Sequence, residues 1–151
     1  MSPISIPNSI LDEARRFFED RGSHGFEGTA MITAGPDGVA RRLIVPDQTA
    51  GAAPHCRVEV SRAGKLQLAA ALAPDERYVA RIHSHPMEPF HSEIDDANPA
   101  LTYEGALSIV APFFGLGLRH GLDLCAVYVL QSGAWSYLET GPNREGRVTV
   151  R

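Results

Sequence analysis

Hydrophobic and polar residues follow two different periods along this chain, one typical of helices and one typical of strands. Apolar side chains recur every three or four positions in residues 9–21, ahead of Gly22, which predicts an amphipathic helix. A second helix is predicted over residues 63–73, because Pro74 disfavours its continuation. Alternating or continuously apolar runs predict strands over residues 29–34, 39–45, 57–60, 78–85, 105–110, 124–130 and 135–138.

The connecting segments complete this outline. Residues 35–38, Gly-Pro-Asp-Gly, predict the turn of a hairpin, and residues 47–55 predict a loop. A short helix is expected over residues 92–98, because Pro99 disfavours helical geometry at the residue before it. The polar C-terminus from Gly141 onward is expected to be frayed. The order of the elements predicts a mixed α/β fold, in which a central mixed β-sheet is flanked by helices.

Composition narrows the class of protein. The 151 residues predict one domain, residues 1–151, that can bury an ordinary core. A net charge of −4 gives no reason to expect nucleic acid, and no apolar run reaches the roughly 20 residues that span a bilayer. Cys56 and Cys125 lie far apart and outside any Cys-x-x-Cys pair, so we expect core or loop residues and not zinc ligands. A cytoplasmic protein is expected.

The segment His83-Ser84-His85-Pro86 carries the strongest chemical signal. Residues i and i+2 of a strand point to the same face, so the two imidazoles project together while Ser84 points away. Pro86 places the pair at the end of the predicted strand. Neutral imidazole suits zinc, and a carboxylate would complete three protein ligands with one position open for water, as in a catalytic site. Because a bare His-x-His also occurs in strands that bind no metal, the pair favours a metal site without establishing one.

Candidate partners for the two histidines follow within a few residues. Ser92 is a good helix N-cap, and Asp95 lies one helical turn beyond it, so both can face one pocket. Asp96 points about 100° away around the helix. His91 and Glu88 are minor candidates for the metal. An ordinary capped helix start explains the Ser92–Asp95 spacing equally well, and the two interpretations are compatible.

Glu27 is the candidate general base. It lies between glycines in Gly25-Phe26-Glu27-Gly28, at the mouth of the first predicted strand, where backbone or substrate can approach closely. A water activated by a metal needs a base to take its proton. Without the histidines, a solvent-facing glutamate in a turn would explain this residue about equally well.

Glu27, His83-Ser84-His85-Pro86 and Ser92-x-x-Asp95 together resemble the JAMM signature of JAB/MPN-type zinc metalloproteases, and the resemblance covers nearly the whole chain. It implies a single JAB/MPN-like domain in which Zn²⁺ is bound by His83, His85 and Asp95. It also implies that Glu27 is the general base and that Ser92 helps to stabilise the tetrahedral oxyanion.

The third metal ligand is open between two neighbouring aspartates. The family usually places this aspartate eleven residues after the second histidine, which is Asp96, and three residues after the serine, which is Asp95. We favour Asp95, because a loop can lose a residue more easily than a helix can change its register. Asp96 stays an alternative.

Residues 91–99 and 103–108 are most similar to bacterial JAB proteins encoded with ubiquitin-like conjugation enzymes. This resemblance implies an isopeptidase or peptidase that cuts after the C-terminal glycine of a ubiquitin-like protein, in a precursor or in a conjugate to a target lysine. The implied partners are that protein, its conjugates, and activating and conjugating enzymes of the same operon. The alternatives are a non-catalytic module that binds a ubiquitin-like tail, and a sulfur-carrier or small-amide hydrolase on the same fold.

Overall fold

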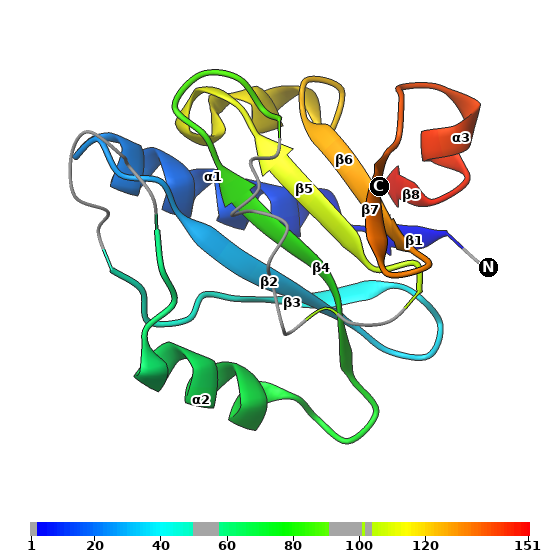
Figure 1. The fold of residues 1–151 in the computed structure, drawn as a ribbon, viewed down its shortest axis with the longest axis horizontal. Helices are drawn as coiled ribbons and strands as arrows, with labels where there is room; N and C mark the ends of the chain where they lie inside the picture. The colour runs from blue at the N-terminus through cyan, green and yellow to red at the C-terminus, as the bar shows by residue number, and fades with distance from the viewer. Residues whose placement is uncertain (1–2, 50–57, 91–100, 102–103) are drawn as a thin grey trace.

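A six-stranded sheet forms the centre of the computed structural model, which describes residues 3–49, 58–90, 101 and 104–151 (Figure 1). The strands lie in the order β3-β2-β4-β5-β6-β7, with the bounds Ala40–Ile44, Thr29–Ala34, Arg77–Ser84, Leu107–Ala111, Ala126–Gln131 and Ala134–Tyr137. Strands β4 and β5 run parallel, and the other neighbours run antiparallel, so the sheet is mixed as predicted. A second, smaller sheet pairs β1 (Ile4–Ile6) with β8 (Val148–Val150) in parallel.

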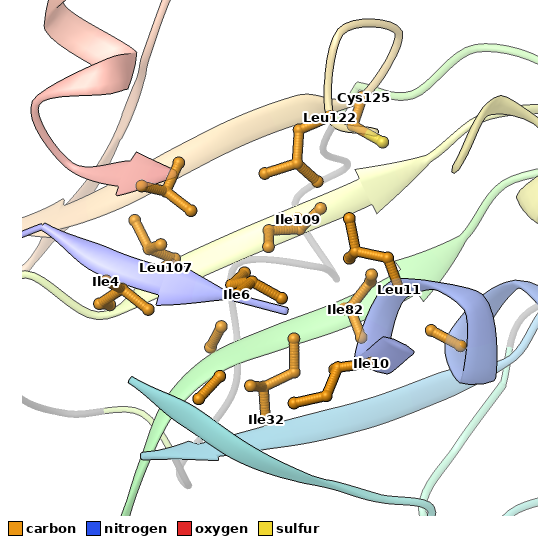
Figure 2. Close-up of a cluster of buried hydrophobic side chains, with 14 of the residues drawn as sticks. Ile4, Ile6, Ile10, Leu11, Ile32, Ile82, Leu107, Ile109, Leu122 and Cys125 are labelled. Atoms are coloured by element: carbon orange, nitrogen blue, oxygen red, sulfur yellow. The ribbon is translucent and has the colours of Figure 1, made fainter. Parts of the chain in front are cut away.

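Helix α1 (Asn8–Gly22) covers one face of the large sheet. Its residues Ile10 and Leu11 point toward Ile32 of β2 and Ile82 of β4, as Figure 2 shows. Both sheet residues are fully buried. Burying an isoleucine side chain of this kind contributes about 1.5–3 kcal/mol. The apolar stripe of residues 9–21 therefore fixes which side of α1 faces the sheet.

Helix α2 (Arg62–Ala71) packs on the opposite face, through Leu68 against Met31 and Tyr78. Met31 precedes Ile32 on β2, and successive strand residues point to opposite faces. On β4, Arg81 and His83 share the face of Met31, because Arg81 pairs with Met31 and His83 pairs with Thr29. The histidines thus lie on the face away from α1.

Several elements differ from the prediction. The C-terminus is not frayed, because β8 pairs with β1 after the short helix α3 (Pro142–Glu145). The buried guanidinium of Arg144 also holds this end by donating to the carbonyls of Leu122, Cys125 and Leu138, at 2.7–3.0 Å. The segment Phe113–His120, labelled η1, was not predicted; it consists of 3-10 turns interrupted by a kink at Phe114 and Gly115.

The predicted strand over residues 57–60 is wrong within its described part, residues 58–60, where Val60 forms one isolated bridge to Gln48. A strand needs a continuous partner, and Gln48 belongs to a loop. The predicted helix over residues 92–98 lies outside the described residues. Across the described ranges, none of the helices has both the length and the apolar character to cross a membrane.

Candidate metal centre

The two histidines of the motif face one another at the end of β4. His83 is the penultimate strand residue and is 4 % exposed, while His85 follows the strand and is half-buried. Their Nε2 atoms lie 3.2 Å apart and their ring centroids 4.9 Å apart. The strand ends one residue earlier than predicted, at Ser84, yet the two imidazoles still converge.

The hydrogen bond at Nδ1 of His85 decides which tautomer this imidazole adopts. Nδ1 lies 2.9 Å from the main-chain carbonyl oxygen of Glu88, which can only accept a hydrogen bond, so Nδ1 carries the proton. The lone pair of His85 is then on Nε2, toward His83. A carbonyl that fixes the ring in this way is the usual outer partner of a metal-bound histidine.

The spacing of the two Nε2 atoms fits a shared ion. Two nitrogens bound to one tetrahedral zinc at ordinary bond lengths lie roughly 3.3 Å apart, close to the 3.2 Å separation of His83 and His85. The residues present therefore fit zinc through the chemistry and the separation of these two donors. The interaction of Glu88 uses its main-chain oxygen, and its exposed carboxylate was only a minor candidate.

The backbone of His85 is fixed from β5 and from the turn that follows it. The His85 amide donates to the carbonyl of Ala111 at 2.9 Å, and the amide of Phe114 donates to the carbonyl of His85 at 2.8 Å. Phe113 and Phe114 both have positive φ angles, 56° and 51°, which are uncommon for residues with a side chain. This turn holds the second histidine although β4 has already ended.

The pairing of β2 with β4 extends to the residues next to Glu27 and His85. Thr29 pairs with His83, and the Ser84 amide donates to the carbonyl of Gly28 at 3.0 Å, so pairing continues beyond the strand. From one further step of this register along both chains, we infer that Glu27 lies across from His85. Paired residues of an antiparallel ladder share a face.

The close packing of Gly28 agrees with this placement of Glu27. A Cβ atom built on Gly28 would lie 2.9 Å from ring atoms of Phe17 and of Phe18, so its Cβ direction points toward α1. Because neighbouring residues of an extended chain alternate, we infer that Glu27 is directed to the opposite face, on which His83 lies. The structure thus brings His83 and His85 together, and it fixes Gly28, the residue after Glu27, against the strand that carries them.

Three side chains that sequence reasoning missed hold this end of β2. Ser84 accepts a hydrogen bond from the Gly28 amide through Oγ, at 2.9 Å. Arg21 donates to the carbonyl of Glu27 at 2.6 Å, and Gln48 both donates to and accepts from the backbone of Thr29 at 2.9 Å. Such contacts between a side chain and a distant main-chain group leave no periodic signal in a sequence.

The remaining predicted site residues, namely Ser92, Asp95, Asp96 and the minor candidate His91, lie outside the described residues. Within the described ranges, His, Cys, Asp and Glu side chains form no group of three that could hold a metal ion. Cys125 is a buried free thiol, as expected of a core residue, and burial raises its pKa to about 12. Cys56 lies outside the described residues.

Comparison with known proteins identifies the fold. The sequence matches no family model and no curated protein. The solution structure of protein DSY2949 from Desulfitobacterium hafniense is similar, with a TM-score of 0.59, 14% identity, and coverage of 98% of this chain and 92% of that one. The crystal structure of AF2198, a JAB1/MPN domain protein from Archaeoglobus fulgidus, is similar with a TM-score of 0.54, 14% identity, and coverage of 99% and 100%. The chain has a JAB/MPN fold.

At 14% identity this likeness concerns the JAB/MPN fold alone, so the chemistry rests on the residues of this chain. The facing histidines at the end of β4 and the adjoining Glu27 segment are what the described part of this fold contributes to a site.

Proposed function

We propose that this protein is a zinc-dependent peptidase or isopeptidase that cuts after the C-terminal glycine of a ubiquitin-like protein. The observation that carries the proposal is the pair of Nε2 atoms of His83 and His85, 3.2 Å apart, with Nδ1 of His85 directed at a carbonyl. The JAB/MPN fold and the β2–β4 register, in which Thr29 pairs with His83, support it further. Asp95, with Asp96 as the alternative, is proposed as the third ligand.

In this proposal zinc, when bound, would polarise the scissile carbonyl of the substrate and lower the pKa of the attacking water. Glu27 takes a proton from the attacking water and delivers it to the leaving nitrogen. Ser92 donates a hydrogen bond to the oxyanion of the tetrahedral intermediate. His83 and His85 stay neutral and act only as ligands, since a protonated imidazole offers no lone pair.

Replacing Glu27 by glutamine tests the base and the metal separately. The Glu27→Gln variant should retain zinc while its kcat for a ubiquitin-like fusion falls by at least roughly 10²-fold, because an amide cannot accept the proton. Metal content by atomic spectroscopy and cleavage of the fusion on a gel are the two readouts. Glu13→Gln changes an exposed carboxylate on α1 and should cut normally. Undiminished cleavage by Glu27→Gln would refute the assignment of the base.

Separate Asp95→Asn and Asp96→Asn variants identify the third ligand. The variant that loses stoichiometric zinc carries the ligand, and retention of zinc by both would exclude the proposed set. A wild-type protein that binds zinc and the ubiquitin-like fusion without cutting it would be a binding module instead.

A further inference from the structure

The C-terminal turn of α1 contacts both halves of the candidate site. At this turn Arg21 donates from Nε to the carbonyl of Glu27 at 2.6 Å and from Nη2 to the carbonyl of Thr49 at 3.0 Å. One guanidinium therefore ties α1 to the segment that carries the proposed base and to a second loop. Both contacts are made to main-chain carbonyl oxygens, so Arg21 acts on the backbone of these segments.

The Glu27 segment needs such a tie because its local sequence does not fix it. Gly25 has a φ of 77°, which glycine adopts readily and most other residues do not. On the C-terminal side, Gly28 is fixed by Ser84 of β4. On the N-terminal side, the Glu27 carbonyl is held by Arg21.

Arg21 is itself held in place by aromatic rings. Its guanidinium carbon lies 5.9 Å from the ring centroid of Phe17 and 6.0 Å from that of Phe26. Partial burial also lowers its pKa, although the guanidinium stays charged. A planar fork that donates in two directions and stacks on rings is particular to arginine, and lysine cannot reproduce it.

The next residue, Gly22, contacts the other half of the site. A Cβ atom built on Gly22 would lie 2.5 Å from Cβ of Phe114, closer than real atoms approach. Phe114 is the residue whose amide donates to the carbonyl of His85. A side chain at position 22 would displace the turn that holds the second histidine.

We propose that Arg21 and Gly22 form a positioning element that sets the general base and a metal ligand relative to one another. Arg21 acts through the backbone of Glu27, and Gly22 acts by admitting the turn that binds His85. This inference rests on the proposed function, in which Glu27 is the base. It assigns separate effects to two adjacent residues that touch neither substrate nor metal.

Arg21→Gln tests the first arm. We expect kcat for the ubiquitin-like fusion to fall, on the order of 10²-fold for a displacement of about 1 Å, while KM and zinc content stay at the wild-type values. Hydrogen exchange of the Gly28 amide should become faster. Arg21→Lys should recover part of kcat at most, and Arg16→Gln, an exposed arginine of the same helix, should change nothing. Wild-type kcat, or a fall explained by lower zinc content, would overturn the role of Arg21.

Gly22→Ala tests the second arm. We expect a higher dissociation constant for zinc, measured by titration in a competing chelator, while Gly28 exchange stays slow. Gly146→Ala, at the end of α3, is the matched control, because a Cβ there would meet only two carbonyl oxygens, of Pro142 at 3.3 Å and of Asn143 at 3.6 Å. Unchanged zinc affinity in folded Gly22→Ala would overturn this arm. If wild-type protein cuts no fusion, the proposed function is wrong, whereas Gly28 exchange and zinc affinity still decide whether α1 positions these segments.

Discussion

Ser84 lies between the two histidines, and its hydroxyl joins the strand of the metal ligands to the segment of the base. The side chain is fully buried, and Oγ accepts the hydrogen bond of the Gly28 amide at 2.9 Å. Replacing Ser84 by alanine removes the acceptor and leaves a buried amide without its partner. A buried donor stranded in this way costs about 1–3 kcal/mol. For a chain of this size the melting temperature should fall by about 2–12 °C.

The assay is thermal or urea unfolding followed by circular dichroism. A chelator is present throughout, because a bound metal would stabilise the folded protein by mass action and obscure the difference. Ser136→Ala, at a partly exposed position of the edge strand β7, is the matched control and should stay within about 0.5 kcal/mol of wild type. If Ser84→Ala lies within the same margin, the hydroxyl is not the partner on which the Gly28 amide depends.

Two further predictions concern stability away from the site. Ser132 has a φ of 51° and precedes Gly133, with a φ of 80°, in the β6–β7 turn, a conformation that asparagine tolerates better than serine. Ser132→Asn should therefore raise the free energy of unfolding by about 0.5–1 kcal/mol in urea titrations. A loss of stability would contradict this prediction. Glu76 has its pKa lowered to about 2, chiefly by the hydrogen bond from Arg42 and then by the Ala73 amide. A lowered pKa gives stability that is present above pH 4.5 and is lost as the pH falls toward 2, so Glu76→Gln should flatten acid unfolding over that window, and an unchanged acid profile would exclude this role.

Local patterns in the sequence predict the elements that build the large sheet. Strand β2 has the predicted bounds, and α1 differs by one residue at each end. In both segments the apolar pattern repeats over enough residues to be detected. Strands β1 and β8 escape such reasoning. Each has three residues, and their pairing joins Ile4 to Val148, nearly the whole length of the chain apart.

In the candidate site, too, only the residues that belong to a periodic pattern could be predicted from the sequence. The period of two predicts that His83 and His85 converge, and their facing Nε2 atoms confirm it. Nothing periodic points to Arg21 or Ser84, whose side chains bind main-chain groups of another element. The choice between Asp95 and Asp96 stays a prediction from helix register.

The register of β2 against β4 decides whether Glu27 shares a face with the histidines, because a slip of one residue would turn it toward α1. Farther along the strands, an irregularity between Ile32 and Thr33 shifts the pairing by one residue. Contacts next to the site also hold the register there. The two hydrogen bonds between Ser84 and Gly28 do this, since one uses the main chain and the other the hydroxyl. The residue between the two histidines thus helps to hold the register on which the inferred face of the proposed base depends.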